Sequence, residues 1–291
     1  MAHIVAIFVV LIWGTTFVSS KVLLNSGLLP ADIFFVRFII AYSCMLCLSH
    51  KRLFANSIAD ELTLAGLGIM GGSLYFLTEN MALLHSTSSN VSILVSTTPL
   101  VTAMLLAIFY QSERLSSRQI CGSVLAFIGV VLVVLNGQLV LHLNPLGDAL
   151  ALGASFTWGF YSLFMRRIMG RYSADFITRK VFFYGLVTIM PYFALVHPLD
   201  IDLLTSGSMT ICGNLLFLGF VASTGGYLLW NWVMRKLGAV KSTNFIYLQS
   251  LVSMVAGHVI LGERITIMAI AGAVILIIGM ILAVRKKRSK T

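Results

Sequence analysis

Two pairs of polar residues interrupt the apolar runs of this chain. Tyr75 and Glu79 are four residues apart, as are Tyr227 and Asn231, and this spacing places both members of a pair on one face of a helix. Glu79 is the only acidic residue well inside an apolar run. We expect it to bind a cationic group of a small molecule or to carry a coupling proton. The alternative is a position near a helix end, where Glu79 is hydrated or paired with a basic residue.

Aromatic residues lie near these pairs in the sequence or recur in matching runs. Rings with a polar tip are suited to the wall of a binding cavity, whereas interface anchoring and ordinary helix packing are the alternative roles. The residues that we expect to line one substrate cavity are Trp13, Tyr75, Glu79, Trp158, Tyr161, Tyr227, Trp230, Asn231 and Tyr247.

The composition determines which elements must position these residues. Of the 291 residues, 58% are hydrophobic and 10% are charged, whereas soluble domains are about 45–50% apolar and about 25% charged. Apolar runs of about 20 residues, each able to cross a bilayer as a helix, recur along the chain. The sequence predicts spans at about 4–24, 31–49, 62–84, 89–109, 119–135, 147–168, 176–197, 209–234, 242–261 and 266–284.

The basic residues alternate between the two sides of the predicted membrane. Fifteen of the 20 Lys and Arg residues fall in every second connection or in the tail, whereas the opposite side holds Arg264 alone. Because basic loops stay in the cytoplasm, both termini are predicted to be cytoplasmic. The same placement in short connections argues against a nucleic-acid partner, although the net charge is +10. The lipid bilayer and a small-molecule substrate are the expected partners.

The two halves of the sequence resemble each other at an offset of about 143 to 152 residues. Trp13-Gly14 recurs as Trp158-Gly159, and Glu113-Arg114 recurs as Glu263-Arg264. Each half contains five predicted spans, so the second half must enter the membrane from the opposite side. The predicted fold is therefore all-α, with ten transmembrane helices as two inverted five-helix repeats around a central cavity. The repeats are expected at 1–136 and 147–285, followed by a basic cytoplasmic tail at 286–291.

This topology suggests two charge pairs between the repeats. Arg37 shares the outer face with Glu263, and Lys180 shares the cytoplasmic face with Glu113. Such pairs can brace or gate the two halves; the alternative is that both cations extend to the lipid headgroups. Pro99 removes a hydrogen bond within the fourth span, so we expect a helix kink beside the cavity, with Ser or Thr hydroxyls satisfying the freed carbonyl.

The sequence resembles the drug/metabolite transporter superfamily, specifically the EamA type with two repeats. The resemblance covers essentially the whole chain. This sequence departs from the family's usual pattern in its second half, where no proline matches Pro99 and Lys180 replaces an arginine. The residues that carry the resemblance are Trp13-Gly14, Pro30, Arg37, the segment from Ala82 through Ser88-Ser89-Asn90 to Pro99, Glu113-Arg114 and Leu261-Gly262-Glu263-Arg264. The resemblance implies a ten-helix basket with a central cavity, and substrates such as amino acids, other metabolites or drugs that are often moved outward.

The expected function is secondary transport of a small metabolite across the cell membrane by alternating access, most readily as an exporter. A passive facilitator or channel and a membrane-embedded enzyme are the alternatives. The six histidines are scattered, and the chain has no H-E-x-x-H, G-x-S-x-G or P-loop motif, so neither an enzyme nor ATP-driven pumping is expected. No metal or cofactor is expected, and energy is expected to come from protons or an exchanged substrate.

Overall fold

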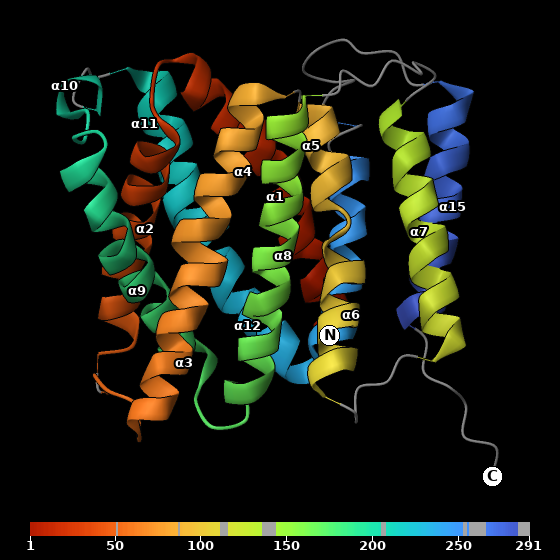
Figure 1. The fold of residues 1–291 in the computed structure, drawn as a ribbon, viewed down its shortest axis with the longest axis horizontal. Coiled ribbons are helices and arrows are strands. Elements are labelled where there is room, and N and C mark those ends of the chain that lie inside the picture. The colour runs from red at the N-terminus through yellow and green to blue at the C-terminus, as the bar shows by residue number, and fades with distance from the viewer. Residues whose placement is uncertain are drawn as a thin grey trace.

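The computed structural model describes residues 1–50, 52–86, 88–110, 116–135, 144–204, 208–252, 255 and 266–284. These residues are almost entirely helical, with no strand among them, and most helices run side by side (Figure 1). The first half contains α1 (Ala2–Asn25), α2 (Pro30–Leu48), α3 (Ile58–Gly68), the π-helical η1 (Ile69–Ser73), α4 (Leu74–His85), α5 (Ser88–Val95), α6 (Thr98–Phe109) and α7 (Ser117–Leu135).

The second half follows a similar order. It contains α8 (Pro145–Ile168), α9 (Ala174–Leu195), the short α10 (Ile201–Leu204), α11 (Met209–Leu216), the π-helical η3 (Phe217–Gly225), α12 (Gly226–Leu237), α13 (Ala239–Thr243), the 3-10 helix η4 (Asn244–Tyr247) and α15 (Ile267–Val284). We call the face where α3 and α9 begin the α3 face, and the face where α4 ends and α8 begins the α4 face. They lie at the bottom and top of Figure 1.

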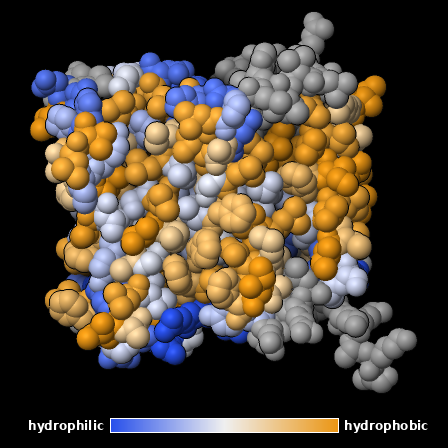
Figure 2. Space-filling view, in the orientation of Figure 1, coloured by the Kyte–Doolittle hydropathy of each residue, from blue (hydrophilic) through white to orange (hydrophobic). Residues whose placement is uncertain are grey.

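Hydrophobic side chains cover the middle of the molecular surface. In Figure 2 they form a broad band, and hydrophilic side chains gather at the upper and lower edges. Within the described residues, four helices are long and apolar enough to cross a membrane: Ala2–Asn25, Pro30–Leu48, Val91–Phe109 and Met209–Leu237. This surface is that of a membrane protein. The count of ten spans remains a prediction from the sequence.

Polar residues start several of the helices at the two faces. The Ser57 hydroxyl accepts a hydrogen bond from the Asp60 backbone N–H at 3.2 Å, and the Asn144 side chain accepts one from Gly147 at 3.1 Å. Each satisfies one of the backbone donors that a helix leaves free at its N-terminus. Pro30 and Pro145 stand in the first turns of α2 and α8, where a missing N–H costs nothing.

Two of the predicted spans contain π-helical segments. The spans expected at 62–84 and 209–234 each contain a π-helical segment, η1 and η3, between two α-helices. Close packing accompanies the distortion at Gly71, because a Cβ there would lie 2.2 Å from the ring of Tyr161. Such segments free backbone carbonyls for other partners: Gly71 accepts from Tyr227 Oη, and Ala222 accepts from Trp13 Nε1 at 3.0 Å.

The predicted fourth span is interrupted before Pro99. α5 ends at Val95 and α6 begins at Thr98. The Thr98 hydroxyl donates to the Val95 carbonyl at 2.6 Å, and Ser155 of α8 also donates to it at 3.2 Å. Val95 is the residue whose carbonyl would otherwise bond the missing N–H of Pro99. Side-chain hydroxyls therefore satisfy the carbonyl that the proline leaves free.

Glycines line the contact between α7 and α15, which lie side by side at one end of the molecule (Figure 1). A Cβ at Gly122 would lie 2.5 Å from the Ala283 nitrogen, and one at Gly129 would lie 2.4 Å from the Leu276 nitrogen. A Cβ at Gly279 would lie 2.2 Å from the Ala126 nitrogen. The two backbones approach so closely that only glycine fits at these positions, as in other membrane helix pairs.

Replacing Gly279 with alanine should therefore destabilise the protein. The added methyl group meets backbone atoms of α7, which cannot move aside, and overpacking of this kind costs about 1–3 kcal/mol. Thermal unfolding of the purified protein in detergent measures the effect. Gly213→Ala is the matched control, since nothing lies within 4 Å of a Cβ there. Equal melting temperatures for the two variants would contradict the packing account.

Candidate functional site

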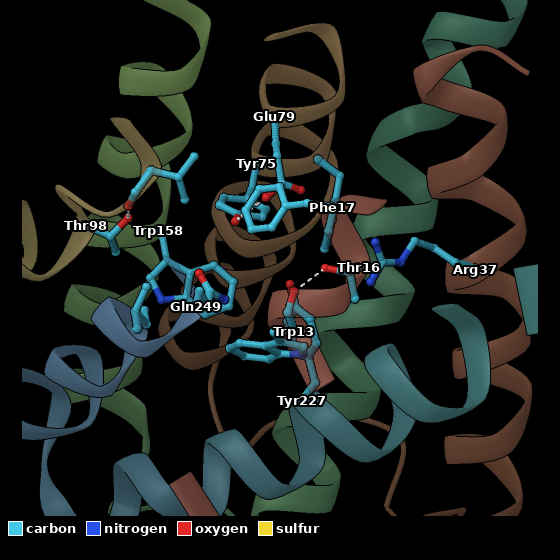
Figure 3. Close-up of a pocket in the computed structure, with 13 residues that line it drawn as sticks. Trp13, Thr16, Phe17, Arg37, Tyr75, Glu79, Thr98, Trp158, Tyr227 and Gln249 are labelled. Atoms are coloured by element: carbon cyan, nitrogen blue, oxygen red, sulfur yellow. Dashed lines mark hydrogen bonds between the residues drawn. The ribbon is translucent and has the colours of Figure 1, made fainter. Parts of the chain in front are cut away.

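A small cavity lies in the middle of the helices, closer to the α4 face than to the α3 face. Its volume is about 30 Å³, which is room for about two water molecules. Side chains come from α1, α2, α4, the α5–α6 break, α8, α12 and the segment around η4, as Figure 3 shows. The lining residues are Trp13, Thr16, Phe17, Arg37, Tyr75, Phe76, Glu79, Val95, Thr98, Trp158, Tyr227, Ile246 and Gln249.

Glu79 and Tyr75 lie together on the cavity side of α4. The Tyr75 hydroxyl donates to Glu79 Oε1 at 2.7 Å, and both side chains are buried, with Glu79 7% exposed. Their spacing of four residues brings them onto the same helix face, as expected. The carboxyl group is thus held in a fixed orientation, with its second oxygen available to a cationic partner.

Arg37 enters the same cavity from α2. Its Nε donates to Ser223 Oγ of η3 at 3.0 Å, and its guanidinium carbon lies 4.1 Å from the centre of the Phe76 ring. Arg37 is only 2% exposed, and it points toward the same space as Glu79 in Figure 3. The cavity therefore carries one cationic and one carboxyl side chain. The predicted partner of Arg37, Glu263, lies outside the described residues, so that pair remains a prediction.

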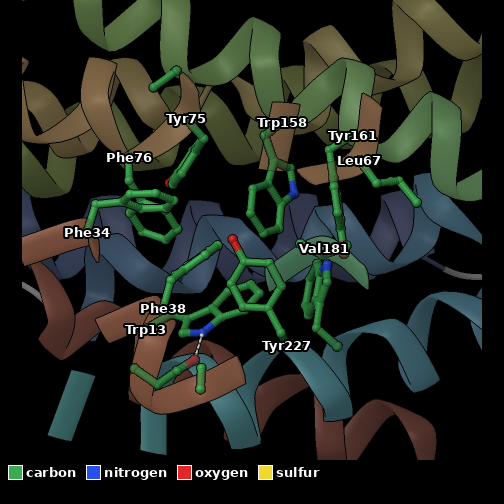
Figure 4. Packing of buried hydrophobic residues seen from close by; sticks show 14 of the residues in the cluster. Trp13, Phe34, Phe38, Leu67, Tyr75, Phe76, Trp158, Tyr161, Val181 and Tyr227 are labelled. Carbon is green, nitrogen blue, oxygen red and sulfur yellow. Dashed lines mark hydrogen bonds between the residues drawn. The ribbon is translucent and has the colours of Figure 1, made fainter. Parts of the chain in front are cut away.

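Aromatic rings form the wall on the α3 side of the cavity. The rings of Trp13 and Trp158 meet edge to face, with centroids 5.4 Å apart, and Tyr227 lies 5.8 Å from Trp13 and 5.9 Å from Trp158. Figure 4 shows these rings around one space. The close approach of Trp13 to α12 depends on Gly226, because a Cβ there would lie 2.5 Å from Trp13 Nε1.

Three of the predicted cavity residues lie behind this wall. Tyr161, Trp230 and Asn231 are fully buried and do not line the cavity. The Tyr161 hydroxyl donates to Asn231 Oδ1, and Asn231 Nδ2 donates to Thr178 Oγ1 at 2.8 Å. Tyr161 and Trp230 belong to the buried hydrophobic cluster, part of which Figure 4 shows.

Tyr247 lies apart from the others. It packs in a separate cluster with Ala126, Val130 and Leu276, from α7 and α15. The structure thus brings together five of the nine predicted cavity residues: Trp13, Tyr75, Glu79, Trp158 and Tyr227.

A cluster of charged residues lies at the α3 face, where the two halves of the chain meet. Lys180 and the Tyr184 hydroxyl both donate to Glu61 Oε1. Arg171 Nη1 donates to Asp60 Oδ1 at 2.6 Å, and the Tyr172 hydroxyl donates to Asp60 Oδ2 at 2.8 Å. The acids come from α3 and their partners from the α8–α9 region.

Sequence reasoning missed Glu61 as a partner of Lys180. The predicted partner, Glu113, lies outside the described residues, so that pair remains a prediction. Glu61 was counted as part of the connection between spans, but α3 begins at Ile58 and carries it in its first turn. An acidic residue in a first turn after Ser57 is a helix-start signal, and this signal could have placed Glu61 next to the membrane.

Several cavity residues were not predicted from the sequence, because they have no charge and no distinctive spacing. Thr16, Phe17, Phe76, Thr98 and Gln249 line the cavity, but each lies among many similar residues in an apolar run. Only the relative rotation of the helices selects them. Among the described residues, no three His, Cys, Asp or Glu side chains lie close enough together to hold a metal ion.

Comparison with known proteins adds independent information. The EamA-like transporter family matches residues 1–135 and 145–285. An "Uncharacterized transporter" of Archaeoglobus fulgidus is 27% identical, over 98% of this chain and 99% of its own. A "Probable amino-acid metabolite efflux pump" of Salmonella typhimurium is 30% identical, over 94% of this chain and 92% of its own.

Two further similarities concern a more distant exporter and the fold. A "Probable terminal-alkyne amino-acid exporter" of Streptantibioticus cattleyicolor is 26% identical, over 78% of this chain and 75% of its own. A solved structure titled "Crystal structure of protein" has a TM-score of 0.75 at 16% identity and covers 97% of both chains. At that identity the likeness concerns the fold alone.

The cluster of charged residues at the α3 face should make the stability of the fold depend on pH. Hydrogen bonding from the Tyr172 hydroxyl, together with the charge of Arg171, holds the pKa of Asp60 below its usual range. A lowered pKa stabilises the fold fully above the unfolded value of about 4, and this contribution is lost as the pH falls through the folded pKa. Melting temperatures between about pH 6 and about pH 3 should fall less steeply for Asp60→Asn than for the wild type. An equal slope for Asp60→Asn and the wild type would contradict this role.

Proposed function

The chain belongs to the EamA-like transporter family, and on that premise we propose that it is a secondary transporter that exports a small metabolite, an amino acid or a related compound. The observation that carries the proposal is the central cavity, in which Glu79 and Arg37 face a space walled by aromatic rings. A transporter needs such a site near the middle of the membrane, where it can be exposed to each side in turn.

The charges in the cavity support a zwitterionic substrate. An amino acid carries an ammonium and a carboxylate group, which complement Glu79 and Arg37 respectively. The walls formed by Trp13, Phe76 and Trp158 suit an apolar or aromatic side chain. The names of the Salmonella typhimurium and Streptantibioticus cattleyicolor relatives, an efflux pump and an exporter of amino-acid compounds, support the same class and direction. A drug-like cation with aromatic rings would use Glu79 and the walls alone.

The proposal includes ten transmembrane helices as two inverted repeats. Matching elements support this arrangement, because α1 and α8 are both 24 residues long and a π-helical segment divides both the α3–α4 and the α11–α12 helices. Reciprocal contacts support it further. Gly122 contacts Gly279, and Gly129 contacts Gly272; with an offset of 150 residues, each contact is the image of the other.

A second reciprocal pair of contacts lies beside the cavity. A Cβ at Gly14 would lie 2.5 Å from the Cβ of Val252, and one at Gly159 would lie 3.7 Å from the backbone nitrogen of Thr102. Gly14 and Gly159 occupy matching positions in the two halves, 145 residues apart, and Thr102 and Val252 match at an offset of 150 residues. A two-fold relation between the repeats, with its axis in the membrane plane, accounts for both pairs.

The size and position of the cavity support alternating access. Its volume of about 30 Å³ holds about two waters and is too small for an amino acid, so substrate binding requires the helices to move apart. The packed rings of Tyr161 and Trp230 and the Lys180–Glu61 contact close the α3 face. If the two halves separate at the α3 face, the central cavity becomes exposed to the solvent on that side. Coupling to protons through Glu79, or to an exchanged substrate, would supply the energy.

We place the protein in the cell membrane with both termini in the cytoplasm, so that the α3 face is cytoplasmic. The distribution of Lys and Arg supports this orientation, since Arg52, Arg166, Arg171 and Lys236 all belong to the connections or helix ends on that side. The two repeats at 1–136 and 147–285 and the basic tail at 286–291 remain part of the proposal, and the tail lies outside the described residues.

Glu79→Gln should reduce substrate-specific counterflow in proteoliposomes by about tenfold or more, because a hydrogen bond to a charged group is worth about 1.5–3 kcal/mol. Radiolabelled amino acids, tested one by one, provide the substrates, and Asp202→Asn provides a matched acid-to-amide control. Full activity with an unchanged pH dependence would remove Glu79 from the mechanism. Flux that rises linearly with substrate concentration in the wild type would instead indicate a passive pore.

A further inference from the structure

A second cavity opens at the α3 face, between the end of α2 and the start of α9. Its volume is about 240 Å³, several times that of the central cavity. Residues of the first half form one wall and residues of the second half the other. The lining residues are Leu48, Ser49, His50, Arg52, Tyr172, Ser173, Asp175 and Phe176.

Arg52 supplies a fixed positive charge at this cavity. Its guanidinium carbon lies 4.8 Å from the Tyr172 ring centre and 5.4 Å from that of Phe176. Its Nε donates to the Phe54 carbonyl at 3.1 Å, and its Nη2 donates to Asn56. The ion pairs among the described residues join Arg171 to Asp60 and Lys180 to Glu61, so the charge of Arg52 has no carboxylate partner there.

The remaining charges at the cavity leave it positive. Burial opposes the ionisation of Asp175, but hydrogen bonds from the Ser173 and Ser49 hydroxyls outweigh it and hold the pKa of Asp175 below its usual range. Its carboxylate is therefore already engaged by its neighbours. Arg179 donates to the Ser49 and Arg52 carbonyls and adds a second cation beside the cavity. Arg52 at the cavity and the buried Arg179 behind its wall outnumber the one carboxylate, and this local charge favours an anionic ligand.

Apolar side chains at the rim indicate what kind of anion fits. Leu48 is 66% exposed, Leu53 59% and Phe54 73%. They adjoin Arg52 at the level where the membrane-spanning part of α2 ends. A free anion would leave these side chains without a partner, whereas a phospholipid would place its acyl chains against them. Basic pockets on the cytoplasmic side of membrane helices bind anionic lipid headgroups in this way.

We propose that this cavity binds the phosphate headgroup of an anionic phospholipid from the leaflet on the α3 face. Arg52 holds the phosphate, and Leu53 and Phe54 contact the acyl chains. The lipid bridges α2 of the first half and α9 of the second half. Its binding therefore stabilises the form of the protein in which the α3 face is closed.

The test measures binding and leaves transport aside, so that its failure is distinct from failure of the proposed function. Purified protein in detergent receives phosphatidylglycerol, phosphatidylcholine with the same chains, or inorganic phosphate, and lipid affinity is measured by native mass spectrometry and thermal shift. We expect phosphatidylglycerol to bind and to raise the melting temperature, and the other two to have little effect. Arg52→Gln should weaken phosphatidylglycerol binding at least about fivefold, corresponding to about 1 kcal/mol for one basic residue at a charged membrane surface.

Lys236→Gln is the control, since Lys236 lies on the same face in the last turn of α12 and outside this cavity; it should bind phosphatidylglycerol like the wild type. If Arg52→Gln does not fold, Phe54→Ser tests the acyl contact at an exposed position and should weaken lipid binding. Equal binding of both lipids, or unchanged affinity in Arg52→Gln or Phe54→Ser, would overturn the proposal. A full thermal shift with inorganic phosphate alone would assign the cavity to a soluble anion and would overturn the lipid assignment.

Discussion

The arrangement of the whole molecule depends on holding a guanidinium and a carboxyl group in the middle of an apolar helix bundle, away from bulk water. A charged side chain at this depth costs about 2.5–3.5 kcal/mol on insertion scales, so each must have partners. Arg37 has Ser223 and the Phe76 ring, and Glu79 has the Tyr75 hydroxyl. The two charged groups and their partners come from three separate elements, α2, η3 and α4, and the helices must be packed closely enough to hold them in register.

Glycines and π-helical turns make this close packing possible. Gly71 admits the ring of Tyr161, and Gly226 admits the indole of Trp13, so the aromatic wall can close the cavity on its α3 side. The carbonyls of Gly71 and Ala222, in the two π-helical segments, then accept hydrogen bonds from Tyr227 and Trp13. The same features that seat the rings of Tyr227 and Trp13 thus satisfy the polar atoms of these two side chains. Both hydrogen bonds join the first half of the chain to the second.

Periodicity and charge placement predict the helical class, the membrane surface and the pairing of Tyr75 with Glu79, because these depend on local spacing. They also predict that Trp13, Trp158 and Tyr227 share the cavity. Rotation and depth of the helices are not local properties, and for that reason Tyr161, Trp230, Asn231 and Tyr247 were assigned to the cavity although they pack elsewhere. The Lys180–Glu61 contact was missed because it joins residues 119 positions apart, through a segment that appeared to be a simple connection.

The central claim is that Arg37 and Glu79 bind the two charges of one zwitterionic substrate. The most direct measurement compares the affinity of the purified protein for its best amino-acid ligand, for the methyl ester of that ligand and for its N-acetyl derivative, in the wild type, Arg37→Gln and Glu79→Gln. The account predicts that Arg37→Gln loses the preference for the free acid over the ester, and that Glu79→Gln loses the preference for the free amine over the N-acetyl form. Preferences that stay the same in both variants would contradict it.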